Sequence, residues 1–225
     1  PALVHLDRLP GLTLTASPGE LGDIALVVPA DSDIHGVADL RGRSIAVLGG
    51  ASSELLLDQW LADAGLARGR DVVGEMHGGI GETAVAAVTS GAADAAVLWD
   101  PWLTRAQQQH GLRVVHAAPF WSVVALYDGR IEDETQYHAA LADALGYVAA
   151  HTDEVAGWVE ARSDIPAEVV VAVLNKNRFV NASAPVDLRV PADTLQRLQE
   201  CEAHAHRTHR VSPGFALRDR MRLLQ

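Results

Sequence analysis

Three short segments combine glycine, hydroxyl and aromatic residues in patterns that suit ligand binding. They are residues 49–53 (GGASS), residues 78–83 (GGIGET) and residues 99–102 (WDPW). Free backbone amides at a glycine-rich turn that opens a helix, together with nearby hydroxyls, can hold a negatively charged group. Aromatic rings beside such a turn can pack against the rest of the ligand. The chemistry predicted here is therefore recognition of a small anion.

In the two glycine-rich segments the candidate ligand residues are Gly50, Ser52, Ser53, Gly79 and Thr83. Glycine permits close approach of the backbone to a ligand, and the hydroxyls can donate hydrogen bonds. An alternative is that the serines and the threonine only cap the helices that follow, which requires no ligand. No Gly-Lys-Ser/Thr sequence follows residues 78–81, so the second segment is not a nucleotide-binding P-loop.

In the aromatic segment the candidates are Trp99, Asp100 and Trp102, and Trp121 is a further candidate for the same wall of the site. The indoles can pack on an apolar or cationic part of a solute, and Asp100 can accept a hydrogen bond from an amine or hydroxyl. In the alternative interpretation Trp102 belongs to the core, and Asp100 caps the helix that Pro101 begins.

The sequence offers no positive sign of catalysis, so no catalytic residue and no cofactor is predicted. No nucleophile and base stand at a recognisable spacing. Cys201 is the single cysteine, which excludes an internal disulfide and a Cys-x-x-Cys site. His204 shares its helix face, but His206 is turned by roughly 140° from Cys201 at 100° per residue, so no metal site is expected.

Composition excludes several classes of partner. The 225 residues carry a formal net charge of −11 and no run of Lys or Arg, which argues against nucleic acid and anionic membrane surfaces. No apolar run approaches the roughly 20 residues of a membrane-spanning helix, so no membrane insertion is expected. The first residues lack the basic-then-apolar order of a signal peptide, so we expect any export signal to lie outside this sequence.

The three segments fall at the ends of predicted strands. Apolar runs predict strands at residues 24–28, 44–48, 71–73 and 92–99, with one helix ending at Gly65 and another over residues 82–90. Alternating strands and helices favour right-handed crossovers and a parallel sheet, in which ligands bind beyond the carboxyl ends of the strands. The three segments are therefore expected to converge at one edge.

The flanking regions differ in character. Residues 1–23 are rich in proline and glycine, which predicts a loop with a short strand at residues 12–15. Two further strands are predicted at residues 112–115 and 122–127. Helices are predicted over residues 103–109, 137–150, 152–161, 166–174, 191–209 and 213–224.

Residues 24–127 resemble the solute-binding proteins of ABC importers for sulfonates, taurine, nitrate and thiamine precursors. The resemblance rests on a strand that runs into a Val-Pro-x-Asp-Ser turn at residues 28–32, on Asp-Leu-x-Gly-x-x-Ile-Ala-Val at residues 39–47, and on Gly-x-x-Asp-Ala at residues 91–95 before Pro101. It implies an α/β, periplasmic-binding-protein-like (type II) parallel sheet lobe with a helical C-terminal tail, and an N-terminal lobe largely missing from this chain.

The resemblance also implies an organisation and a role. Residues 1–23 would be a remnant of the first lobe or a loop, residues 24–127 the ligand-binding lobe, and residues 128–225 a helical segment that packs back on the first lobe. The implied protein is a monomer in the periplasm or another extracytoplasmic location, with a lipid anchor as one option. It would bind a small organic anion and pass it to an ABC permease.

Two other roles fit the same resemblance. Relatives include a sulfinate desulfinase and a thiamine-pyrimidine synthase, so an enzyme on this scaffold is one alternative. Those enzymes use a cysteine or histidine of the first lobe, and Cys201, late in the helical tail, matches neither. A ligand-sensing module of a larger regulator is the other alternative.

Overall fold

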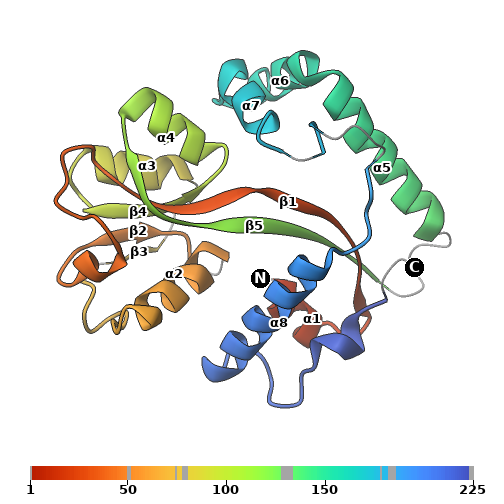
Figure 1. The fold of residues 1–225 in the computed structure, drawn as a ribbon, viewed down its shortest axis with the longest axis horizontal. Coiled ribbons are helices and arrows are strands. Elements are labelled where there is room, and N and C mark those ends of the chain that lie inside the picture. Colours follow the sequence, from red (N-terminus) through yellow and green to blue (C-terminus); the bar gives the residue numbers. More distant parts are fainter. Residues whose placement is uncertain are drawn as a thin grey trace. The chain divides into compact units, whose positions relative to one another are not determined.

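A computed structural model describes residues 2–49, 52–73, 75–77, 81–127, 134–177, 179–181 and 186–222. Helices and strands alternate through the first half of the chain, and helices dominate the second half (Figure 1). In chain order the elements are α1 (Ala2–Arg8), β1 (Leu12–Val28), η1 (Val37–Leu40), β2 (Ile45–Val47), α2 (Ser52–Asp63), β3 (Glu75–His77), α3 (Gly81–Thr89), β4 (Ala95–Trp99), α4 (Trp102–His110), β5 (Arg113–Tyr127), α5 (Glu134–Ala150), α6 (Thr152–Glu160), α7 (Ala167–Leu174), α8 (Ala192–Arg207) and η2 (Leu217–Arg220).

The sheet has the strand order β3-β2-β4-β1-β5. β2 pairs in parallel with both β3 and β4, with Val47 opposite His77 and Ala46 opposite Ala96. β1 pairs with β4 in the antiparallel sense and places Ile24 opposite Trp99. The predicted parallel pairing of three strands is therefore confirmed for β2, β3 and β4, whereas the antiparallel β1 makes the whole sheet mixed and not parallel as predicted.

The chain forms two compact units. The sheet unit consists of Gly22–Phe120 and Glu168–Val173, and the helix unit consists of Pro1–Leu21, Trp121–Ala167 and Leu174–Gln225. The boundaries after residues 21 and 120 fall inside β1 and β5, so each of these strands contributes residues to both units.

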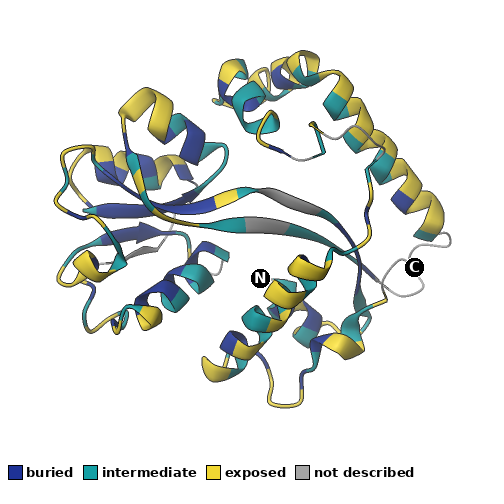
Figure 2. Cartoon of the chain, in the orientation of Figure 1, coloured by how far each residue is buried: buried dark blue, intermediate teal, exposed yellow. Residues whose placement is uncertain are grey.

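The sheet unit is buried on both faces of its sheet. Alternate residues of β1 belong to different apolar clusters: Leu26 packs with the α2 residues Leu57 and Leu61, whereas Val27 packs with Val88 of α3. Side chains of a strand point to opposite faces in turn, so this alternation requires cover on both sides. Figure 1 shows α2 on one side and α3 and α4 on the other, and Figure 2 shows β2 and β4 buried.

The helix unit brings the two ends of the described chain together. An apolar cluster joins α1, β1, α8 and η2, and it contains Leu6, Leu14, Phe215 and Leu217. The carboxylate of Asp7 accepts hydrogen bonds from the Ser212 backbone amide at 2.9 Å and from its hydroxyl at 2.6 Å. On α5, the buried His138 contacts the Thr15 hydroxyl at 3.1 Å.

The prediction of a loop over residues 1–23 is wrong. Residues 2–8 form α1, and β1 is one strand of 17 residues that contains Pro18. Its ladder with β4 covers only Ile24 to Val27, so the missing amide of Pro18 breaks no bond of that ladder. The two strands predicted within residues 112–127 are likewise a single strand, β5.

Two further element predictions are corrected. The second parallel strand is Glu75–His77, not residues 71–73, because the Asp71 carboxylate accepts bonds from Ala67 and Arg70 and closes a turn. The helix predicted over residues 213–224 is only η2, since Met221 forms an extended bridge with Leu14. The helices predicted over residues 82–90, 103–109, 137–150, 152–161, 166–174 and 191–209 are confirmed within about three residues as α3 to α8.

Among the described residues, every helix is too short or too polar to cross a lipid bilayer.

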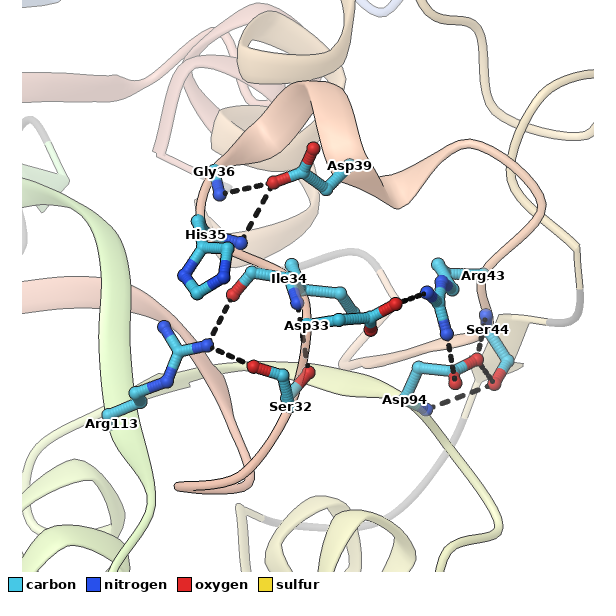
Figure 3. Close-up of polar contacts among 10 residues, drawn as sticks. All are labelled: Ser32, Asp33, Ile34, His35, Gly36, Asp39, Arg43, Ser44, Asp94 and Arg113. Atoms are coloured by element: carbon cyan, nitrogen blue, oxygen red, sulfur yellow. Dashed lines mark hydrogen bonds and ion pairs between the residues drawn. The ribbon is translucent and has the colours of Figure 1, made fainter.

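The amino ends of β2 and β4 are held together by one polar network (Figure 3). The Asp94 carboxylate accepts hydrogen bonds from the Ser44 backbone amide and hydroxyl, both at 2.8 Å, and lies 3.6 Å from Arg43. Arg43 also pairs with Asp33 at 2.5 Å. The bond from the Ser44 amide is the largest of several causes that lower the pKa of Asp94.

The turn after β1 is fastened by a second set of contacts in the same view (Figure 3). The guanidinium of Arg113, on β5, donates to the carbonyl oxygens of Ser32 and Ile34, both at 2.6 Å. The Asp39 carboxylate accepts bonds from the backbone amides of His35 and Gly36 and so caps η1. The side chains of Arg113 and Asp39 thus fix the backbone of the segment that leads from β1 to β2.

We predict that Asp94→Ala lowers the free energy of unfolding by about 1 kcal/mol at neutral pH, a value reduced for the 38% exposure of this side chain. The folded-state pKa of Asp94 lies below the ordinary value of 3.8. Its stabilisation is therefore fully present above pH 4 or so and is lost as the pH falls through the folded-state pKa. Urea unfolding of wild type and variant between pH 7 and pH 3 measures this difference.

Asp31→Ala, which removes an exposed carboxylate of the same unit, is the control and should change stability little at any pH. A deficit of Asp94→Ala that stays constant down to pH 3 would contradict the assignment of its stabilising role to the ionised carboxylate.

Candidate functional site

The carboxyl ends of β2, β3 and β4 lie at one edge of the sheet, because these strands run in parallel. A helix follows each of them: α2 begins at Ser52, α3 at Gly81 and α4 at Trp102. The first amides of a helix lack intrahelical partners, and the helix dipole places partial positive charge there. This edge, called here the carboxyl edge, therefore collects three positive helix ends.

In the first turn the two predicted serines have different surroundings. Ser52 is half-buried at the first position of α2. Ser53 is 1% exposed, and its hydroxyl donates to the Leu48 carbonyl oxygen at 3.5 Å. The structure thus leaves Ser52 as the serine with access to a ligand, whereas Ser53 faces the protein. Gly50 lies outside the described residues.

An ion-pair cluster stabilises α2 behind this turn. The guanidinium of Arg68 contacts Glu54 at 2.7 Å and Asp58 at 2.8 Å, and all three side chains are at most 20% exposed. Glu54 lies in the first turn of α2, where a carboxylate also interacts favourably with the helix dipole. The single positive charge of Arg68 offsets only one of the two carboxylate charges.

In the second turn Gly81 also makes room for the side chain of Trp102. A Cβ atom at this position would lie 2.4 Å from the indole of Trp102, so only glycine fits without displacing the ring. Thr83 is exposed at the third position of α3, and Glu82 pairs with Arg105 of α4 at 3.3 Å. Gly79, the other predicted residue of this turn, lies outside the described residues.

Trp99 and Trp102 form an edge-to-face pair at the carboxyl edge. Their ring centroids are 5.5 Å apart, and the ring planes are inclined by 81°. Both side chains are half-buried: Trp99 packs against the cluster on the α2 face and Trp102 against the cluster on the α3 and α4 face. Each indole therefore combines a core contact with remaining accessible surface, so the core and ligand interpretations are compatible for both.

The Asp100 carboxylate is engaged within the protein. Its Oδ1 accepts hydrogen bonds from the Thr104 backbone amide at 3.0 Å and from the Thr104 hydroxyl at 2.6 Å. Its Oδ2 lies 3.3 Å from the position that a Cβ atom would occupy at Gly22. The carboxylate thus accepts an amide of the first turn of α4, which favours the helix-capping alternative, although the N-cap position itself is Pro101. Trp121 lies on β5 within the helix unit, and its side chain is outside the described part of the chain.

Three residues of this edge were not predicted from the sequence: Gly22, Gly81 as a contact of Trp102, and Thr104. The bond from Thr104 to Asp100 spans four residues, beyond the usual reach of an N-cap side chain to the second or third helical amide, so no simple capping motif in the sequence indicates it. The two glycine contacts join segments that are distant along the chain, so no local pattern reveals them.

Two other features belong to the helix unit. A cavity of about 230 Å³ is lined by residues of α8 and the η2 region, including Glu202 and Met221. Cys201, on α8, is partly buried, and burial raises the pKa of its thiol. Within the described ranges, no three His, Cys, Asp or Glu side chains gather as metal ligands.

Comparison with known proteins gives one family and one shared fold. The family model described as ABC transporter, phosphonate, periplasmic substrate-binding protein matches residues 12–155. The periplasmic aliphatic sulphonate binding protein SsuA from Escherichia coli is similar over 100% of this chain and 74% of its own, with 21% identity and a TM-score of 0.78. None of the curated proteins matches the sequence.

Two further structures share the fold. The alkanesulfonate-binding protein SsuA from Xanthomonas axonopodis pv. citri, bound to MOPS, is similar over 100% of this chain and 78% of its own, with 20% identity and a TM-score of 0.69. The desulfurization enzyme DSZB is similar over 98% of this chain and 80% of its own, with 19% identity and a TM-score of 0.68. A binding protein and an enzyme thus have the same architecture.

We predict that Gly81→Ala destabilises the protein by about 1–3 kcal/mol, because the new methyl group must displace the Trp102 indole. Gly146→Ala is the matched control: it lies inside α5 with no atom near the added Cβ, and alanine favours a helix. Urea unfolding followed by tryptophan fluorescence measures both variants. Equal stability of Gly81→Ala and wild type would show that the contact of Gly81 with Trp102 does not constrain this edge.

Proposed function

The chain belongs to the ABC-transporter family of phosphonate periplasmic substrate-binding proteins, and from this we propose that it binds a small organic anion at the carboxyl edge for import. Its fold is accordingly periplasmic-binding-protein-like and α/β, as predicted. The family match covers residues 12–155, which include β2, β3, β4 and the helices that follow them.

The observation that carries the proposal is the convergence of three helix starts, at Ser52, Gly81 and Trp102, at the carboxyl ends of three parallel strands. A protein with a net charge of −11 does not attract an anion by its overall field. Local amides and helix dipoles are then the available source of attraction. The proposed contacts are the backbone at Gly50 and Gly79 and the hydroxyls of Ser52 and Thr83.

The proposed solute carries a sulfonate, phosphonate or similar anionic head group. Taurine, nitrate and thiamine precursors are further candidate solutes. The ligand-binding lobe of the proposal is residues 24–127, with residues 1–23 as a remnant of the first lobe and residues 128–225 as a helical segment that packs back on the first lobe. The partner is an ABC permease, and the protein acts as a monomer in the periplasm or lipid-anchored outside the cytoplasm. Family membership supports an extracytoplasmic location and a permease partner.

The alternative of an enzyme has one observation in its favour, the fold shared with the desulfurization enzyme DSZB. Cys201 gives it no support, because burial raises the pKa of this thiol and so lowers its thiolate fraction at neutral pH. A ligand-sensing module is the remaining alternative. Turnover of a bound solute would favour the enzyme, and binding without turnover the other two.

We predict that the full-length protein binds a member of a panel of alkanesulfonates, alkylphosphonates, taurine, nitrate and thiamine precursors in titration calorimetry. Ser52→Ala should weaken binding of that member by about 10- to 100-fold, the value of one hydrogen bond to a charged group, with little change in Tm. Ser90→Ala is the control, because Ser90 follows the far end of α3 and its hydroxyl donates to the Ala87 carbonyl at 3.2 Å.

Ser90→Ala should bind as wild type does. If Ser52→Ala and wild type bind the solute equally, the carboxyl edge is not where the anion is held.

A further inference from the structure

The carboxyl edge contains two indoles whose positions are fixed by the protein. Gly81 has no side chain, and the Trp102 ring occupies the space that a Cβ atom would need. Trp99 meets Trp102 at 81°, an edge-to-face geometry in which neither ring shields the whole of the other. Both residues keep part of their surface accessible. A ligand held at this edge therefore meets a rigid aromatic surface.

The carboxylate of Asp100, which lies between the two tryptophans in the sequence, is already engaged within the protein. Its Oδ1 accepts hydrogen bonds from the amide and hydroxyl of Thr104, and its Oδ2 lies 3.3 Å from the position that a Cβ atom would occupy at Gly22. Removing these contacts to bind an ammonium group would leave the first turn of α4 without its cap. Taurine and other amino-sulfonates thus gain no matched partner from this residue.

Resting on the proposed anion site, we propose that the natural solute carries a flat apolar body, of the aryl or heteroaryl sulfonate or phosphonate class, and that Trp99 and Trp102 select for it. A planar ring can stack on or against an indole and bury apolar area on both partners. A short alkyl chain buries much less area, and a zwitterion loses the hydration of its ammonium group without compensation.

The test is titration calorimetry of the full-length protein with benzenesulfonate, ethanesulfonate and taurine. We expect benzenesulfonate to bind at least about tenfold more tightly than ethanesulfonate, and taurine to bind no more tightly than ethanesulfonate. Trp99→Ala should abolish the preference for the aryl ligand, whereas Trp99→Phe, which keeps an aromatic face, should retain most of it. Trp158→Ala, a 45% exposed tryptophan of α6 in the helix unit, is the control and should keep the full preference.

Different results overturn different claims. If ethanesulfonate binds and benzenesulfonate binds no more tightly, or if the preference survives in Trp99→Ala, the inference about the aromatic body is wrong while the anion site stands. Tighter binding of taurine than of benzenesulfonate also overturns it. If none of the three ligands binds, the proposed anion site fails and the inference fails with it.

Discussion

Parallel pairing of β2 with β3 and β4 is the constraint on which the rest of the sheet unit depends. The chain moves outward from β2 to β3 and then back past β2 to β4. Right-handed crossovers in opposite directions place α2 and α3 on opposite faces, which explains the two separate apolar clusters. Each of the parallel strands also leads into its helix at the same edge, so three positive helix ends meet there.

The two ends of the parallel strands are stabilised in different ways. At the amino ends, Asp94 joins Ser44 and Arg43 through hydrogen bonds and an ion pair. At the carboxyl edge, close packing stabilises the structure, because the Trp102 indole occupies the space that a side chain at Gly81 would need. Charged side chains thus stabilise the amino ends, whereas the carboxyl edge combines backbone dipoles and aromatic surface with ion pairs such as Glu82–Arg105. The backbone dipoles can attract an anion locally in a protein that is acidic as a whole.

Much of the sheet unit could be predicted from sequence, because its signals are local. Apolar runs marked β2 and β4, and Gly65 takes the left-handed φ of +70° expected of a helix stop. The remaining elements, β1 among them, depend on pairing with segments that are distant along the chain. The proline and glycine content of β1 indicated a loop, yet its ends are held by strands and by Met221. The role of Asp100 was left open between helix capping and ligand binding, and its bonds from Thr104 favour capping.

The most direct test of the central claim is backbone amide exchange of the full-length protein with and without a bound alkanesulfonate. If the carboxyl edge holds the anion, the amides at the starts of α2 and α3, those of Ser52 and Gly81 among them, gain protection on binding. The amides of Ser44 and Asp94, at the opposite ends of the strands, stay unchanged. Protection gained at Ser44 and Asp94, with none at the helix starts, would contradict the account.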